Sequence, residues 1–135
     1  MATKTILLID PDHDVAASVA TILEAEGYRV TIAQSLQKVG ELTSASRFDL
    51  VITEALGQRQ TFNFDPSFLT PLKSAIGSAP IILLSTYVTT DTIRPADHGL
   101  AAVVPKPFEL DELLDKVSRA LQADGHEVNG TRQRR

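Results

Sequence analysis

The feature that most constrains the fold is a series of short apolar runs separated by amphipathic stretches. One of these runs covers Leu50 to Thr53, in which Leu50, Val51 and Ile52 are apolar, and the acidic residue Glu54 follows it directly. Such continuously apolar runs are typical of strands in a parallel sheet whose two faces are both covered by helices. Similar runs predict strands over Ile6 to Ile9, Leu50 to Thr53, Ile81 to Leu84 and Ala102 to Val104, and Tyr28 to Ala33 is interpreted as a further strand.

The stretches between these strands predict helices. Apolar residues recur at helical spacing over Val15–Leu23, and either Asp12 or Asp14 can cap this first helix. Ser35 caps a second helix, and the most regular one covers Leu110–Leu121. Since no hairpin signal joins consecutive strands, right-handed crossovers predict an α/β fold in which a five-stranded parallel sheet is doubly wound, with helices on both faces.

Prolines disturb the third and fourth helices. The third is predicted to be short, to start near Pro66 with Asp65 as its cap, and to be disturbed at Pro71. Pro95 limits the fourth helix to a turn or two. The aromatic residues of this region either fold back into the core or anchor a partner, and the sequence leaves both readings open for Phe62, Phe64 and Phe68.

Length and charge limit the classes of function. The 135 residues suffice for one domain, predicted over 1–123, followed by a flexible C-terminal tail over 124–135. The net charge of −4 leaves −6 on the body, since the last eleven residues carry Glu127 against Arg132, Arg134 and Arg135. An acidic body is a poor match for a phosphate backbone, so nucleic-acid binding is expected only as a weak alternative through the tail.

The absence of cysteine, of a signal segment and of a long apolar stretch predicts a cytoplasmic protein that does not enter membranes. The sequence contains neither a nucleophile elbow nor a glycine-rich phosphate cradle, and no enzyme activity is predicted.

Polar residues follow the predicted strands at the points where the strands end. The carboxyl ends of parallel strands meet at one edge of a sheet, where ligands of α/β proteins usually bind. The sequence therefore predicts one pocket that contains Asp10, Asp12, Glu54, Ser85, Thr86 and Lys106.

These segments resemble the receiver domain of bacterial two-component response regulators. The resemblance spans residues 4 to about 122 and rests on four motifs in order, of which the triplet Lys106-Pro107-Phe108 is the most specific. The others are Ile6-Leu7-Leu8-Ile9-Asp10, Phe48-Asp49-Leu50-Val51-Ile52-Thr53-Glu54 and Pro80-Ile81-Ile82-Leu83-Leu84-Ser85-Thr86. It implies a flavodoxin-like fold and a role in signal transduction through another protein, such as a kinase or an effector, or through a second copy of the chain.

In the family resembled, an aspartate takes up a phosphoryl group while carboxylates hold Mg²⁺, a lysine pairs with a phosphoryl oxygen and a hydroxyl reads the product. The resemblance implies that Asp10, Ser85 and Lys106 match the first acid, the hydroxyl and the lysine. It also implies departures: Glu54 stands in place of the acceptor aspartate, and Pro11 in place of a second acid.

Further departures concern the switch and the metal. Val103 replaces the switch aromatic, for which Tyr87 is a conceivable substitute. We expect no resident metal, with Asp10, Asp12 and Glu54 as weak candidate ligands for Mg²⁺. The chain is therefore expected to be a pseudo-receiver, an atypical receiver that works by protein-protein contact without phosphorylation.

The alternative is an Mg²⁺-dependent phosphoacceptor that retains some phosphotransfer. Glu54 itself has two readings. Its longer side chain either mimics an acyl phosphate beside Lys106 and Ser85, or forms a buried ion pair with Lys106 that neutralises an unused pocket.

Overall fold

The structure, a computed structural model, describes the backbone of residues 3–54, 66–85 and 93–129. The strands are β1 (Thr5–Ile9), β2 (Arg29–Ala33), β3 (Leu50–Thr53), β4 (Ile81–Ser85) and β5 (Ala102–Pro105). The helices are α1 (His13–Ala25), α2 (Leu36–Ala45), α3 (Leu69–Ile76) and α4 (Leu110–Asn129), with 3₁₀ turns η2 (Pro66–Phe68) and η3 (Pro95–His98). Each strand lies within a residue of its predicted bounds at either end.

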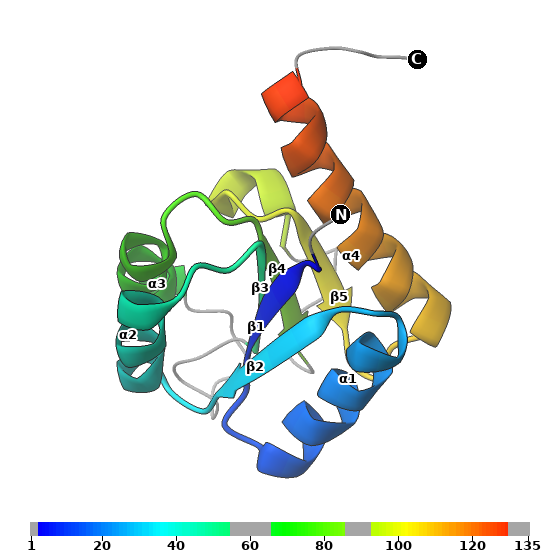
Figure 1. Ribbon diagram of the computed structural model, residues 1–135, viewed down its shortest axis with the longest axis horizontal. Coiled ribbons are helices and arrows are strands. Elements are labelled where there is room, and N and C mark those ends of the chain that lie inside the picture. Colours follow the sequence, from blue (N-terminus) through cyan, green and yellow to red (C-terminus); the bar gives the residue numbers. More distant parts are fainter. Residues whose placement is uncertain (1–2, 55–65, 86–92, 130–135) are drawn as a thin grey trace.

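The five strands form one parallel sheet in the order β2-β1-β3-β4-β5. Helices α1 and α4 cover one face, and α2 and α3 cover the other (Figure 1). The predicted doubly wound α/β fold of the flavodoxin-like type is therefore confirmed. The chain passes from β1 outward to β2 and then returns to β3 on the other side of β1, so the strand order reverses at the carboxyl ends of β1 and β3, where α/β sheets leave a crevice for function.

The core consists of two layers because successive strand residues face opposite sides of the sheet. Ile6 and Leu8 of β1 pack with the buried faces of α1 and α4, whereas Leu7 and Ile9 pack with α2 and α3. Phe68 lies in the second layer and is 6% exposed, so it belongs to the core. Phe62 and Phe64 lie outside the described residues.

The third and fourth helices are reduced, as predicted. Pro71 lies in the first turn of α3, where a missing N–H removes no helical hydrogen bond, so the helix continues through it. The predicted cap Asp65 lies outside the described residues, and the N-terminal cap of α3 is Phe68, which makes no side-chain capping bond. Pro95 begins the single turn η3, which ends at Gly99 in the left-handed conformation.

Gly99→Ala should lower the free energy of unfolding by about 1–2 kcal/mol, because φ is 69° and an L residue is strained there. Its Cβ would also lie 2.7 Å from Lys73 Nζ, which donates a hydrogen bond to the carbonyl of His98. Gly40→Ala is the matched control: Gly40 lies inside α2 with open space around it, and alanine should raise stability by about 0.5–1 kcal/mol. Urea unfolding of both variants measures these changes, and a Gly99→Ala variant as stable as the parent would contradict the expectation.

The last helix, α4, runs to Asn129 and so extends past the predicted domain boundary at 123. No proline interrupts this stretch, so backbone hydrogen bonds alone can continue the helix beyond its apolar face. The division at 123 and the flexible tail stay predictions, and residues 130–135, with the basic residues of the tail, lie outside the description.

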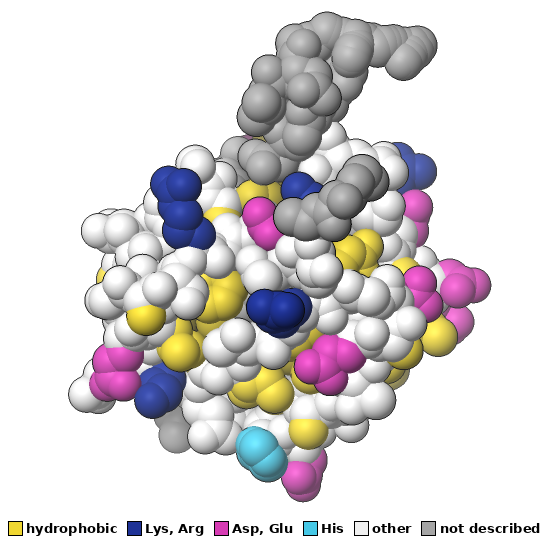
Figure 2. Space-filling view, viewed as in Figure 1, with side chains coloured by type: hydrophobic (Ala, Val, Ile, Leu, Met, Phe, Trp, Pro, Cys, Tyr) yellow, Lys and Arg dark blue, Asp and Glu magenta, His cyan; other side chains and the backbone are white. Residues whose placement is uncertain are grey.

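The surface offers no broad apolar area on the face shown in Figure 2, where hydrophobic side chains lie in small areas separated by polar and charged ones. Leu110, at 49%, is the large hydrophobic residue that stands out as exposed in the part of the chain that the structure describes. Within that same part, no helix is long and apolar enough to cross a membrane.

Candidate functional site

The carboxyl ends of β1 and β3 place two acidic residues side by side. The amide of Glu54 donates to the carbonyl of Ile9 at 2.8 Å, and the amide of Asp10 donates to the carbonyl of Ala33 at 3.0 Å. These bonds continue the parallel ladders just beyond the strands. They fix the backbone from which both carboxylates project, and both residues are buried, with exposures of 3% for Asp10 and 6% for Glu54.

Lys106, which follows β5, joins the two carboxylates. Its Nζ lies 2.9 Å from Asp10 Oδ2 and 2.9 Å from Glu54 Oε2. The three side chains are 14%, 5% and 7% exposed for Lys106, Asp10 and Glu54, so the ion pairs are largely shielded from water. The peptide bond between Lys106 and Pro107 is cis. One ammonium thus serves two buried carboxylates, and the charged pocket, defined as Asp10, Glu54 and Lys106, holds one negative charge in excess.

The pKa of Lys106 reflects a competition between burial and charge. Burial lowers the pKa because it disfavours the charged ammonium, whereas the hydrogen bonds to Asp10 and Glu54 and their negative charges raise it. The attractions outweigh burial, so the pKa lies above its ordinary value of 10.5. Lys106 is therefore an ammonium at neutral pH.

This shift predicts a stability loss in alkali. A lysine whose pKa is higher in the folded state than in the unfolded state stabilises the fold fully below the unfolded value of 10.5, and this contribution disappears as the pH rises through the higher folded value. The free energy of unfolding, measured in urea from neutral to strongly alkaline pH, should fall above about pH 10.5. The fall should be smaller in Glu54→Gln, which removes one of the two attracting charges, and an equal fall in both proteins would contradict this cause.

The other predicted pocket residues have different outcomes. Asp12 is the N-cap of α1, as its type and position predicted, and His13 is exposed in the first turn. Ser85 ends β4, where its backbone pairs with Pro105, but its side chain is not part of the described structure. Thr86 and Tyr87 lie outside the described residues. Val103 is 1% exposed and packs in the core layer of α2 and α3.

Thr53 is a residue of this site that the sequence analysis treated only as the end of a strand. It is fully buried, and its hydroxyl donates to the carbonyl of Glu54 at 2.8 Å. A hydroxyl in an otherwise apolar strand was the signal that could have identified it, since a buried polar group needs a hydrogen-bond partner.

Among the described residues, the donor set of the pocket fits Mg²⁺ poorly. This ion needs about six oxygen ligands in near-octahedral geometry. Both carboxylate oxygens of Asp10 already accept hydrogen bonds, Oδ2 from Lys106 Nζ and Oδ1 from the amide of Asp12, at 2.9 Å each. Oδ1 of Asp12 accepts from the amides of Asp14 and Val15. Pro11 has no ligand atom in its side chain, and among the described residues no three acidic or histidine side chains are placed to hold a metal. The expectation that the pocket holds no metal stays a prediction.

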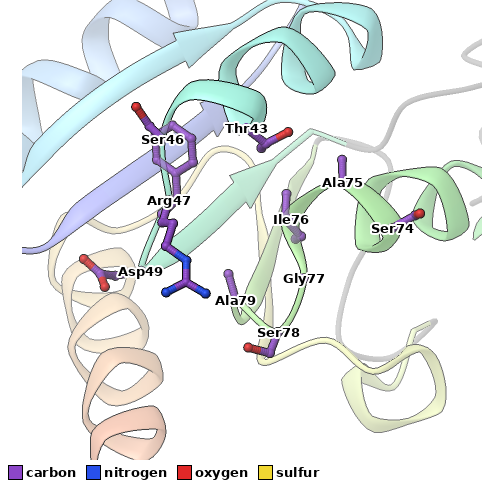
Figure 3. A pocket seen from close by; sticks show the side chains of 11 residues that line it. Thr43, Ser46, Arg47, Asp49, Ser74, Ala75, Ile76, Gly77, Ser78 and Ala79 are labelled. Atoms are coloured by element: carbon purple, nitrogen blue, oxygen red, sulfur yellow. The ribbon is translucent and has the colours of Figure 1, made fainter.

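A hollow lies at the opposite, amino-terminal end of β3 and β4, and the sequence did not predict it. It has a volume of about 470 Å³ between the ends of α2 and α3. Figure 3 shows Arg47 and Asp49 on one side of the hollow and the segment Ser74 to Ala79, in which all residues but Ile76 are small, on the other. Hydroxyls and small side chains dominate the lining, and no hydrophobic pattern marks such a hollow in a sequence.

Known proteins share both the sequence pattern and the fold. Residues 6–118 match the response regulator receiver domain family. The DNA-binding transcriptional regulator NtrC of Bradyrhizobium sp. (strain RP501 Parasponia) is 32% identical over 123 residues, which are 90% of this chain and 25% of that protein. Protein Rrf1 of Nitratidesulfovibrio vulgaris is 31% identical over 117 residues, 86% of this chain and 81% of that protein. The chain spans about a quarter of the length of the NtrC proteins that it matches.

Solved structures agree on the fold. The signal receiver domain of an HD domain-containing protein from Pseudomonas fluorescens Pf-5 superposes with a TM-score of 0.77 at 22% identity, covering 97% of this chain and 96% of that one. The chemotaxis response regulator CheY4 of Vibrio cholerae has a TM-score of 0.69 at 23% identity, covering 89% and 100%. Receiver domains are signalling modules of two-component systems. By the family match over most of its length, this chain belongs to the response regulator receiver domain family.

Proposed function

We propose that this receiver domain is atypical and acts as a phosphorylation-independent protein-protein interaction module, with Glu54 at the position equivalent to the phosphoacceptor aspartate. The observation that carries the proposal is the position of Lys106 Nζ, 2.9 Å from both Glu54 and Asp10. The lysine that would pair with a phosphoryl oxygen already has two anionic partners. A phosphoryl group would have to displace at least one of them.

The chemistry of Glu54 supports the same conclusion. Its side chain is one methylene longer than that of aspartate, and phosphoryl transfer depends on a nucleophile placed to within about an ångström. The donor set around Asp10 also fits Mg²⁺ poorly, and this ion neutralises the phosphoryl oxygens during transfer. Both requirements for phosphorylation are therefore weakened at one site.

Of the two readings of Glu54, the charge arrangement favours the neutralising ion pair. A mimic of an acyl phosphate would draw Lys106 toward Glu54, whereas Lys106 lies equally close to Asp10. Two buried carboxylates need a counter-charge whether or not the domain signals. We therefore regard the pocket as one that phosphorylation does not switch, and another protein, a kinase or an effector, as the partner.

The test is an amide NMR titration of the unaltered protein, first with Mg²⁺ and then with beryllofluoride as a phosphoryl mimic. We expect no saturable shifts at Asp10, Glu54, Ser85 or Lys106, because the lysine is occupied and the described residues offer few metal ligands. Saturable shifts clustered at these residues would overturn the proposal in favour of an Mg²⁺-dependent phosphoacceptor switch. An established phosphorylatable receiver domain, titrated in parallel, verifies that the reagents are active.

A further inference from the structure

Asp10 joins the charged pocket to the beginning of α1. Its Oδ2 accepts a hydrogen bond from Lys106 Nζ at 2.9 Å, and its Oδ1 accepts one from the amide of Asp12 at 2.9 Å. Because Asp10 is 3% exposed, water has little access to replace either partner. A single buried carboxylate thus holds the pocket lysine with one oxygen and the residue that precedes α1 with the other.

Asp12 in turn organises the first turn of α1. Its Oδ1 accepts from the amides of Asp14 at 3.0 Å and Val15 at 3.2 Å, and its carbonyl accepts from the amide of Ala16 at 3.0 Å. The first amides of a helix have no partner within the helix, so they depend on such a cap. The order of this turn therefore depends on where Asp12 is held.

Glu54 belongs to the same series of contacts. It bonds Lys106 through its carboxylate, and its amide donates to the carbonyl of Ile9, which directly precedes Asp10. The series Glu54, Lys106, Asp10, Asp12 connects the ends of β3, β5 and β1 to a helix on the surface. A change in charge at Glu54 or Lys106 alters the pull on the Asp10 carboxylate, and the Asp10 carboxylate holds the cap.

We infer that the charged pocket controls the order of the first turn of α1, and that this turn is where a change in the pocket becomes visible at the surface. The inference rests on the proposed function and deepens it, because it names what an unphosphorylated pocket regulates. Asp12, His13 and Asp14 are exposed, so a change in their order is accessible from outside the domain. Val103, which stands in place of the switch aromatic, is only 1% exposed and belongs to the core, so it does not present a change in the pocket at the surface.

Amide hydrogen exchange of the 135-residue chain tests the coupling directly. In Lys106→Met, exchange at the amides of Asp12, Asp14 and Val15 should accelerate about tenfold more than exchange in the middle of α1, which is the scale expected for loss of a helix cap. The comparison within one helix separates the local effect from a general loss of stability, because general unfolding accelerates both regions together. Glu54→Gln, which keeps the lysine and one carboxylate, should act in the same direction with a smaller effect.

Two control variants give the exchange expected when the cap itself is lost and when an exposed lysine is replaced. Asp12→Ala removes the cap itself and should accelerate exchange at Asp14 and Val15 without changing the pocket. Lys38→Met makes the same substitution at the exposed pair between Lys38 and Glu41, 3.2 Å apart, and should leave α1 unchanged.

The coupling would be wrong if both Lys106→Met and Glu54→Gln accelerate exchange in the first turn only as much as in the middle of α1. The amides to compare are those of Asp12, Asp14 and Val15. Glu54→Gln keeps the test decisive if Lys106→Met does not fold. The exchange series contains no phosphoryl mimic, so its outcome is independent of the beryllofluoride titration, which alone decides on phosphorylation independence.

Discussion

Lys106→Met should lower the free energy of unfolding by about 3–5 kcal/mol, the cost typical of removing one partner from a buried ion pair. The substitution keeps most of the side-chain volume but removes the ammonium that bonds both Asp10 and Glu54, which are only 3% and 6% exposed. Water cannot compensate two such shielded carboxylates, and their mutual repulsion adds to the cost of burial. A domain of this size is stable by about 5–15 kcal/mol, so a folded population should remain.

Urea unfolding at neutral pH measures this loss. Lys38→Met is the matched control, because the side chains of Lys38 and Glu41 are 55% and 58% exposed, and such surface pairs contribute about 0–1 kcal/mol. If Lys106→Met lowers the free energy of unfolding no more than Lys38→Met does, the contacts of Lys106 with Asp10 and Glu54 do not stabilise the fold, and the expectation is wrong.

Replacing Pro11 and Glu54 together by aspartate should raise the affinity for Mg²⁺ above that of the unaltered protein. Pro11→Asp supplies an oxygen ligand beside Asp10, and Glu54→Asp shortens the carboxylate that now reaches Lys106. The affinity for Mg²⁺ should rise by about tenfold or more for each ligand gained, since 1.4 kcal/mol corresponds to a factor of ten. Each single variant should bind more weakly than the double variant.

Calorimetric titration with MgCl₂ measures the gain, and CaCl₂ in place of MgCl₂ tests the preference for a small octahedral ion. An unchanged Mg²⁺ titration in the double variant, with the fold intact, would contradict the proposed equivalence of Glu54 to the acceptor position and of Pro11 to a metal ligand.

The charged pocket was predictable because it depends on strand ends. Asp10, Glu54 and Lys106 each lie within two residues of the end of a predicted strand, and parallel strands bring such positions together whatever the detailed packing. In the structure the three side chains lie together, and one lysine bonds both carboxylates. Which oxygen each partner uses depends on side-chain rotamers, and sequence spacing carries no information on them.

Helix lengths were less predictable. Pro71 was expected to disturb α3, yet it occupies the first turn, where its missing amide costs nothing. The extension of α4 to Asn129 had no apolar periodicity to mark it. Both the continuation of α3 through Pro71 and the length of α4 depend on where each helix starts and ends relative to the sheet. Helix propensity alone does not determine these positions.

The sequence by itself determined the order of strands and helices, the parallel sheet with two covered faces, and the collection of charged residues at its carboxyl edge. These follow from local patterns, because apolar periodicity and the handedness of crossovers leave few alternatives. The tertiary structure alone decided that Asp10 connects Lys106 to the cap of α1, and that a hollow opens between the ends of α2 and α3. Both join residues distant in the chain, and such contacts are fixed only when the helices pack on the sheet.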